Sequence, residues 1–445
     1  MYYSLLVFPV LLAVVTAGRS PHADLVDKLE RSPEGGRYSS NVFEDGRLDL
    51  ESVIRKYQYP YESHHVLTED GYILGAVRIP HGRDQNNQPG SKPVVLILHG
   101  LLSSSADFVL LGPGHALSYM LAEEGYDVWL LNSRGNFHSR NHTTLDPNRR
   151  GDPSFWAFSW EEMGRFDLPA YIDYILEVTG QEKVHFIGHS QGATSFLTGM
   201  SLRPEYNEKI ISFQGLAPAA FFYNNRNPVF LNIAPFERVL EVSELNFILI
   251  LPKEIHCRIV GKQSLAGQLG IYEILGRNDL LTPLLMQVCR DGIFTQTLCK
   301  LLVQYDRNDG IFNTKFQTMF PAFLGHAPSG SSIRQLTHYG QNIRFGTFSR
   351  FHYGHIQNLI TYGRVNPPPF NLNLITARSY LHYALSDFEA DYRDVLLLEE
   401  LLPNARAIQV PRAGFTHIEF IWGMDAREQV YETALQMMRE AESLQ

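Results

Sequence analysis

The sequence predicts an α/β fold in which a mostly parallel central sheet is flanked by helices and carries a large, mainly helical insertion. Short runs rich in Val, Ile and Leu alternate with longer segments of helical periodicity in the first half of the chain, which indicates repeated strand and helix units. The runs are nearly continuous, as in strands buried on both faces. The alternation of strands and helices then stops for about 160 residues. A connection between two parallel strands needs only about a dozen residues, so the additional length predicts the insertion.

The composition indicates a globular protein and excludes several classes of function. The chain has 445 residues, of which 44% are hydrophobic and 19% charged, so it has room for a large enzyme core or two to three domains. The net charge is −9 and no segment forms a basic stripe, which excludes nucleic acid as a partner. Three cysteines without paired spacing predict neither a disulfide scaffold nor a zinc site.

Residues 1–18 have the pattern of a signal peptide. The apolar run Leu5–Val15 is too short to span a bilayer comfortably and is followed by the small residues Thr16, Ala17 and Gly18. The segment lacks Lys and Arg before the apolar run, and an uncleaved anchor or a buried strand is the alternative. No later window holds 18 consecutive apolar residues, so we expect an exported chain without a transmembrane anchor.

The strands are expected in a defined order after an N-terminal segment, residues 19–50. His64–Leu67 and Tyr72–Ile79 flank the turn signal Asp70-Gly71 and predict a hairpin. Further strands are expected at Pro93–Leu98, Asp127–Leu131, Val184–Ile187 and Ile210–Phe213, with helices at Trp160–Val178 and Ala193–Met200.

The core is expected in two parts, 51–220 and 371–445, separated by an insertion over 221–370. The next good strand candidate after the break is Leu381–Leu385, and a loop-like stretch is expected at Gly325–Ser332 within the insertion. Leu-rich stretches predict helices in the insertion at Asn246–Leu251, Leu280–Val288 and Leu298–Val303, and the chain closes with a strand, Ala407–Val410, and a helix, Asp425–Glu442.

The sequence Gly-His-Ser-Gln-Gly at Gly188–Gly192 stands between an expected strand and an expected helix. This context predicts a nucleophile elbow, a tight turn that presents the Ser190 hydroxyl at the carboxyl edge of the sheet. The following helix N-terminus favours negative charge that develops there. The five-residue pattern arises by chance in roughly one chain of this length in six, so the prediction depends on the strand and helix around it.

A serine nucleophile needs a base, and the base needs an acid that fixes its tautomer. In this arrangement the chain order is Ser, acid, His, which points to the C-terminal quarter. His382 lies inside an expected strand, whereas His417 follows Ala407–Val410 on a loop, so His417 is the predicted base. The alternative for His417 is a surface or capping histidine.

Four carboxylates follow the strand at Leu381–Leu385. Asp387 is the first of them and can reach the sheet edge, so it is the predicted acid. Glu389, Asp391 and Asp394 are interpreted as solvated charges near a helix start, with Asp394 as the helix cap.

The segment His99–Leu102 follows the strand at Pro93–Leu98. The loop at this place normally supplies one amide of an oxyanion hole, and the residue after the nucleophile supplies the other. Leu101 and Gln191 are therefore the predicted amide donors. Taken without Ser190, His-Gly is a common turn signal.

Two covalent modifications are expected on an exported chain. Asn141 begins the sequon Asn-His-Thr and is a candidate glycosylation site in an exposed loop. Cys289 and Cys299 are close enough in sequence to form a disulfide, which leaves Cys257 as the odd thiol. The alternative is three buried cysteines that pack as small hydrophobic residues.

Taken together, several segments resemble the acid lipase family, the gastric and lysosomal acid lipases and their insect relatives, within the α/β-hydrolase superfamily. The segments stand at His65–Leu74 (HVLTEDGYIL), Arg78–Pro80 (RIP), Leu98–Leu102 (LHGLL), Asn132–Asn136 (NSRGN), Phe155–Met163 (FWAFSWEEM), Gly188–Gly192 (GHSQG), Ser329–Ser332 (SGSS), Thr337–Gln341 (THYGQ) and His417–Gly423 (HIEFIWG). The resemblance covers most of the chain. It implies an α/β-hydrolase fold with Ser190 as nucleophile, Asp387 as acid and His417 as base. It also implies an oxyanion hole at Leu101 and Gln191, and a cap and lid in the insertion.

The chain departs from the family pattern at a few positions. Gln58 replaces a Gly, Phe137-His138 replace Thr-Trp, and Leu385–Glu389 is a loose version of Gly-Asn-Asp-Trp-Leu. The step from Asp387 to Asp394 is kept. We therefore expect changes in acyl-chain preference and in the shape of the acid loop, with the reaction unchanged.

The resemblance implies a secreted or lysosomal lipase that hydrolyses carboxylic esters of neutral lipids, triacylglycerol or cholesteryl ester, through an acyl-Ser190 intermediate. No metal or organic cofactor is expected, and the cap is expected to contact a lipid surface transiently. One alternative is a catalytically idle lipid-binding or storage protein of the same fold, against which the complete Ser, Asp and His set argues. The other is a soluble short-chain esterase, against which the large insertion argues.

Overall fold

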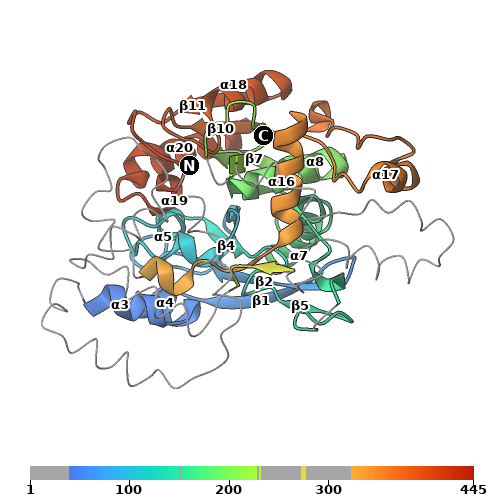
Figure 1. The fold of residues 1–445 in the computed structure, drawn as a ribbon. Coiled ribbons are helices and arrows are strands. Elements are labelled where there is room, and N and C mark those ends of the chain that lie inside the picture. Colours follow the sequence, from blue (N-terminus) through green and yellow to red (C-terminus); the bar gives the residue numbers. More distant parts are fainter. Residues whose placement is uncertain (1–39, 150–151, 228–229, 232–271, 277–321, 445) are drawn as a thin grey trace, which may run out of the picture.

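The computed structural model describes residues 40–149, 152–227, 230–231, 272–276 and 322–444 (Figure 1). The expected signal peptide, the three Leu-rich stretches of the insertion and the cysteines Cys257, Cys289 and Cys299 lie outside the described residues.

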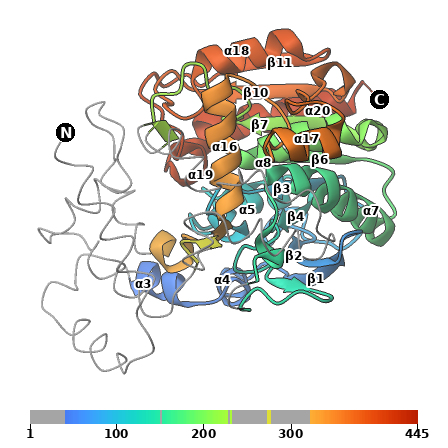
Figure 2. The same cartoon turned by 45° about the vertical axis from the view of Figure 1, so that its right-hand side comes forward.

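The core is a sheet of nine strands that runs from β1 at the bottom to β11 near the top of Figures 1 and 2. The spatial order is β1-β2-β4-β3-β6-β7-β10-β11, and β5 pairs with β2. Strands β1, β2 and β5 pair antiparallel, whereas all pairs from β4 to β11 are parallel. The bounds are β1 (Glu62–Leu67), β2 (Tyr72–Ile79), β3 (Val94–Leu98), β4 (Asp127–Leu131), β5 (Asn141–His142), β6 (Val184–His189), β7 (Ile210–Leu216), β10 (Ser379–Tyr383) and β11 (Ala405–Gln409).

This sheet confirms the expected fold class and every strand expected from the sequence. A second, two-stranded sheet pairs β8 (Glu273–Ile274) with β9 (Ser331–Ser332). The chain order reverses at β3, whose neighbours are β4 on one side and β6 on the other. The carboxyl ends of β3 and β6 therefore flank the point where parallel α/β sheets usually place a ligand.

Helices cover both faces of the sheet, and every residue of β3, β4 and β6 is therefore buried. The longer helical elements are α3 (Ser40–Arg47), α4 (Leu50–Lys56), α5 (Leu117–Glu123), α6 (Trp160–Glu162), η4 (Met163–Asp167), α7 (Leu168–Thr179), α8 (Gln191–Leu202), α16 (Ile333–Phe345), α17 (His355–Tyr362), α18 (Tyr392–Leu401), α19 (Glu419–Trp422), η8 (Arg427–Tyr431) and α20 (Glu432–Glu442). In Figure 1, α5 and α20 lie to the left of the strands, and α7 and α8 to the right. Arg439 on α20 pairs with Glu124, directly after α5, at 2.7 Å.

The helix expected over Trp160–Val178 is present, but a π-helical turn, η4, separates α6 from α7. This turn packs closely on α8. A Cβ at Gly164 would lie 2.5 Å from the Ser195 carbonyl oxygen, and a Cβ at Gly199 would lie 2.7 Å from the Gly164 carbonyl oxygen. Two glycines therefore allow the backbones of η4 and α8 to touch.

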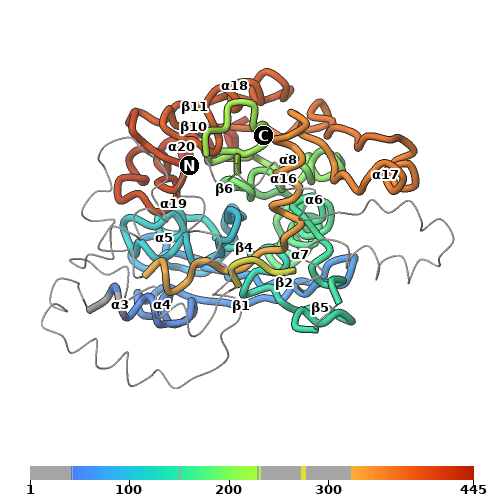
Figure 3. The backbone as a smooth tube through the Cα atoms, viewed as in Figure 1, coloured from blue at the N-terminus to red at the C-terminus, as the bar shows by residue number. Residues whose placement is uncertain are grey.

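Helix α16 joins the described part of the insertion to the core (Figure 3). Its Gln335 accepts a hydrogen bond from the Gln191 side chain at 2.7 Å, and its Tyr339 hydroxyl lies 3.2 Å from that of Thr194. The ring of His338 stacks on Trp160 with centroids 3.7 Å apart. The motif around Thr337–Gln341 therefore packs against the helix that follows Ser190.

The expectations that Asp394 caps the helix after Asp387 and that Asp391 and Asp394 are solvated were wrong, because both residues are buried. Helix α18 begins at Tyr392, and its cap is Asp391, whose carboxylate accepts a hydrogen bond from the Arg393 amide at 3.1 Å. Asp394 lies in the first turn and accepts hydrogen bonds from Asn224, at 2.9 Å from the amide and 2.8 Å from the side chain. Asp394 therefore connects the first turn of α18 to the start of the insertion at Asn224.

A buried ion cluster around Arg134 joins three separate segments. The Arg134 side chain is 1% exposed and donates to Asp70 in the β1–β2 turn at 2.6 Å and to Asp167 in η4 at 2.7 Å. The guanidinium carbon also lies 4.0 Å from the centre of the Tyr72 ring. This cluster accounts for the arginine of the Asn132–Asn136 motif.

We predict that Arg134→Met lowers the free energy of unfolding by about 3–5 kcal/mol, because it leaves the buried carboxylate of Asp167 and the half-buried carboxylate of Asp70 without a cation. Arg55→Met is the control, since Arg55 and its partner Glu51 are 56% and 48% exposed and such pairs contribute at most about 1 kcal/mol. Urea unfolding of both variants measures the difference. Equal, small losses would mean that the cluster around Arg134 contributes little to stability.

Candidate active site

Ser190 forms the turn between β6 and α8 and has a strained backbone, with φ at 51° and ψ at −114°. The surrounding backbone leaves no room for a side chain two residues before or two residues after Ser190. A Cβ at Gly188 would lie 2.6 Å from the Ala193 nitrogen, and a Cβ at Gly192 would lie 2.3 Å from the Leu98 carbonyl oxygen. The Gly188–Gly192 segment therefore has the geometry expected of a nucleophile elbow.

Two backbone amides next to Ser190 are available for an oxyanion. Gln191 is the first residue of α8, so its N–H points out of the positive end of that helix. Leu101 follows Gly100, where a Cβ would lie 3.3 Å from the Ser190 Cβ, so this loop passes directly against the candidate nucleophile. Within the part of the chain that the structure describes, neither amide donates to an internal acceptor.

The His99 ring supports the Leu101 loop from inside the molecule. Its Nε2 accepts hydrogen bonds from the Ser133 amide at 3.1 Å and the Asn136 side chain at 3.0 Å. Its Nδ1 lies 2.8 Å from the Gly100 carbonyl oxygen and donates to it. Burial lowers the pKa of His99 to about 4, so the ring stays neutral and keeps this arrangement.

A second support comes from the Ser329–Ser332 motif. The Ser329 amide donates to the Leu102 carbonyl oxygen at 2.8 Å, and the Ser329 carbonyl oxygen accepts from the Phe137 amide at 2.8 Å. Leu102 needs this support because its φ is 62°, a backbone conformation that residues other than glycine rarely adopt.

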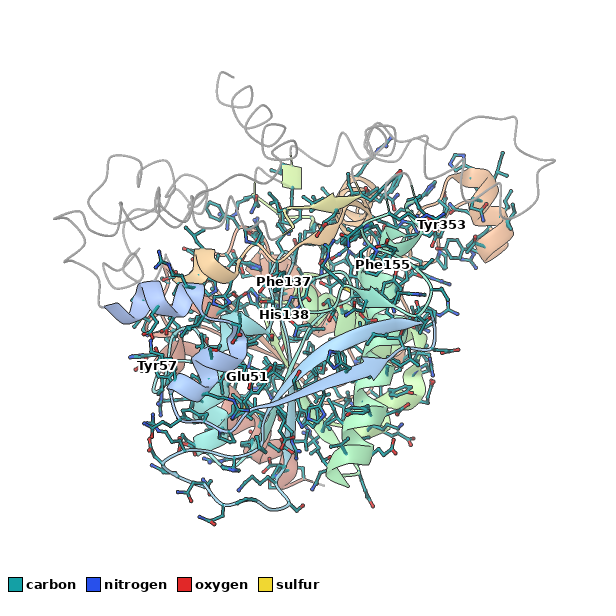
Figure 4. All side chains as sticks on the ribbon, turned by 90° about the horizontal axis from the view of Figure 1, so that it is seen from below. Glu51, Tyr57, Phe137, His138, Phe155 and Tyr353 are labelled. Carbon is teal, nitrogen blue, oxygen red and sulfur yellow. The ribbon has the colours of Figure 1, made fainter. Side chains whose placement is uncertain are left out.

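Figure 4, which views the molecule from below, shows Phe137 and His138 near the centre and Glu51 and Tyr57 on the side of α4.

His417 and Asp387, which are far apart in sequence, form a direct contact. The Nδ1 of His417 lies 2.8 Å from Asp387 Oδ2. Asp387 is fully buried, and its other oxygen accepts hydrogen bonds from the amides of Glu389 and Ala390 at 2.8 Å each. The carboxylate is therefore fixed in position and has one oxygen directed at the histidine.

His417 lies beside the elbow. The ring of His189, the residue before Ser190, donates from Nε2 to the His417 carbonyl oxygen at 3.2 Å, and the two ring centroids are 5.0 Å apart. Burial, together with the nearby His417, holds the pKa of His189 well below its usual range, so that ring is neutral. The loop that carries His417 is tied down by Glu419, which accepts from the Thr416 amide and hydroxyl at 2.8 Å each.

The other candidates for base and acid lie elsewhere. His382 is buried in β10, its Nε2 lies 2.9 Å from the Gln214 side chain, and burial lowers its pKa to about 3. Asp391 pairs with Arg226 at 3.2 Å as well as capping α18. The expectation that Glu389 is a solvated charge was wrong, because its carboxylate is directed at His417 and lies 3.2 Å from the Nε2 of that ring.

The remaining predicted sites are only partly described. Asn141 is exposed and belongs to β5, paired with Ile73, where the sequence suggested a loop. The expected disulfide partners lie outside the described residues. Among the residues that the structure describes, no group of three His, Cys, Asp or Glu side chains is placed to hold a metal ion. Within the same ranges, every helix is too short or too polar to cross a membrane.

Comparison of the sequence with known proteins shows the family to which the chain belongs. The chain matches a partial alpha/beta-hydrolase lipase region over residues 50–112 and the alpha/beta hydrolase fold over residues 93–221. It is 37% identical to Lipase 1 of Drosophila melanogaster over 92% of this chain and 84% of that protein. It is 33% identical to the gastric triacylglycerol lipase of Rattus norvegicus over 89% of this chain and 93% of that protein. Among solved structures it is similar to a thermophilic esterase from Thermogutta terrifontis, with 11% identity, a TM-score of 0.44 and coverage of 85% of this chain and 99% of that one.

The identity to the two lipases extends over most of each chain, and the sheet has the strand order and the strained turn described above. The chain belongs to the acid lipase family of the α/β-hydrolase superfamily and is a carboxylic ester hydrolase.

Proposed function

We propose that this protein is a lipase that hydrolyses the ester bonds of neutral lipids with Ser190, His417 and Asp387 as its catalytic residues. The observation that carries the proposal is the 2.8 Å contact of His417 with Asp387, on a loop that touches the residue next to the strained Ser190. Three groups that acyl transfer requires support the proposal: a hydroxyl on a strained turn, an imidazole, and a buried carboxylate in contact with Nδ1 of that imidazole.

In the first half of the reaction, the Nε2 of His417 takes the Ser190 hydroxyl proton as Oγ attacks the ester carbonyl carbon. The negative charge that forms on the carbonyl oxygen is stabilised by the amides of Leu101 and Gln191 and by the N-terminus of α8. Asp387 keeps the proton of His417 on Nδ1 and stabilises the imidazolium. The tetrahedral intermediate then expels the alcohol, which receives the proton from His417, and the acyl group stays on Ser190.

In the second half, water replaces the alcohol. His417 takes a proton from the water, the hydroxide attacks the acyl-Ser190 carbonyl, and the same two amides stabilise the oxyanion. Collapse of this intermediate releases the fatty acid and returns the proton to Ser190 Oγ. The cycle requires no group beyond the protein and water.

The substrate and the location are part of the proposal. Triacylglycerol is the first substrate we propose, because one relative is named a gastric triacylglycerol lipase, and cholesteryl ester is the second. The segment 221–370 would contact the lipid surface transiently. The apolar N-terminus supports removal of a signal peptide and secretion, with the lysosome as a further destination, and the exposed Asn141 is suited to carry a glycan.

We predict that Ser190→Ala abolishes hydrolysis of both a triacylglycerol emulsion and a dissolved short-chain ester, with a loss of about a million-fold in kcat. Alanine has the same backbone preferences as serine, so the melting temperature should stay near that of the wild type. Ser195→Ala, on the same helix, is the control and should keep its activity, because the Ser195 hydroxyl is buried and turned to Met163 at 3.9 Å. Retention of more than a few per cent activity by Ser190→Ala would refute the proposed nucleophile.

The acid loop provides an internal comparison. Asp387→Asn should lower kcat by about four orders of magnitude, because an amide cannot hold His417 in the reactive tautomer. Asp391→Asn and Asp394→Asn remove the same charge from the same loop and should affect stability more than kcat, since their partners are Arg226, Arg393 and Asn224. Steady-state kinetics on a short-chain ester distinguishes them. A dead Asp391→Asn beside an active Asp387→Asn would show that the acid is misassigned.

A further inference from the structure

Glu389 places a second carboxylate on the imidazole of His417. Its Oε2 lies 3.2 Å from the Nε2 of His417, while Asp387 holds Nδ1 at 2.8 Å. Its Oε1 accepts a hydrogen bond from the Asn227 side chain at 2.7 Å, and its own amide donates to Asp387 at 2.8 Å. Both oxygens therefore have a defined partner, and the ring is held between two carboxylates.

This arrangement requires one more proton than the neutral histidine that acts as a base. A carboxylate only accepts hydrogen bonds, so the contact of Nδ1 with Asp387 uses the proton on that nitrogen. The approach of Glu389 to Nε2 is favourable only when the ring or the carboxyl group carries a second proton, because a lone pair and a carboxylate repel each other. The Nε2 lone pair, which must face the Ser190 hydroxyl, is then occupied.

We propose that Glu389 is a positioning residue that shares one proton with His417 and thereby sets the lowest pH at which His417 can act as the base. This inference rests on the proposed role of His417. Because the two groups titrate together, the shared proton belongs to the pair and not to one residue. The pair loses this proton at a higher pH than a histidine without the neighbouring carboxylate would. Activity is therefore lost on acidification earlier than it would be without Glu389.

Among the residues that the structure describes, the other charged and titratable groups around the pair do not supply this proton. Asp387 accepts from the amides of Glu389 and Ala390 and faces the opposite nitrogen. His189, from the elbow, is kept neutral by burial, which lowers its pKa. Tyr339 on α16 is also neutral, because burial raises its pKa. The Arg226 guanidinium pairs with Asp391 and lies 4.2 Å from the centre of the Phe388 ring.

Burial supports the shared proton. Although 32% of the Glu389 side chain is exposed, burial of the carboxyl group raises its pKa, and the nearby Asp387 acts in the same direction. Residue 389 is Glu in this chain, whereas the resemblance described above implies Leu at this position. A leucine at this place would have no proton to share.

The test is the pH dependence of phosphorylation of Ser190 in the full-length protein, a reaction in which His417 takes the same hydroxyl proton. The rate of inactivation by a small dialkyl aryl phosphate is measured from pH 4 to 9 in the wild type, Glu389→Gln, Glu389→Leu and a control, Glu400→Gln, which removes the same charge from an exposed position on α18. Both Glu389 variants should shift the acid midpoint of the rate to lower pH by roughly one unit, the lower end of the effect of a close opposite charge. The control should match the wild type.

The result separates this inference from the proposed function. Phosphorylation of Ser190 with an unchanged midpoint in both Glu389 variants would overturn the role of Glu389 and leave the catalytic residues in place. Absence of any reaction at Ser190 in the wild type would overturn the proposed function itself. Melting temperatures and the rate at pH 9, where the pair has lost its proton in every variant, show whether a variant is folded.

Discussion

The backbone of Ser190 is held at a φ of 51° between β6 and α8, and a side chain at Gly192 would lie 2.3 Å from the carbonyl oxygen of Leu98. This close approach brings the ends of β3 and β6 together, and with them the two segments that carry Gln191 and Leu101. The conformation costs on the order of 1–3 kcal/mol and persists only because the surrounding structure imposes it. A strand on one side and a helix on the other supply that constraint.

The polar residues around the turn hold the loops that the turn brings together. His99 links the Leu101 loop to the Asn132–Asn136 motif, and Ser329 links it to the described part of the insertion. On the opposite side, Asp387 and Glu389 fix the ring of His417. Most of these groups are buried and have partners, so the site is rigid before a substrate arrives, which is the condition for electrostatic stabilisation of an oxyanion. Two motifs that resemble the family, Asn132–Asn136 and Ser329–Ser332, therefore support the loops next to Ser190.

The strands could be predicted because strands buried on both faces need continuous apolar runs, and β4 begins and ends at the expected residues, Asp127–Leu131. The contact of Asp387 with His417 could be anticipated from chain order and strand ends. The π turn could not, because it packs on α8 through two glycines that lie far apart in sequence, Gly164 and Gly199. Nor could the contact of Glu389, since a charged residue near a helix start is usually solvated and only the folded acid loop turns this one toward the histidine.

We propose that the strained turn makes Ser190, among all the serines of the chain, the reactive one. A fluorophosphonate ester tests this directly, because it labels only a serine that has both a base and an oxyanion hole. The native protein is labelled, digested and analysed by mass spectrometry, with the heat-denatured protein as the control. We expect one equivalent of label, on Ser190, in the native protein and none in the control. Label on another residue, or equal label in both samples, would contradict it.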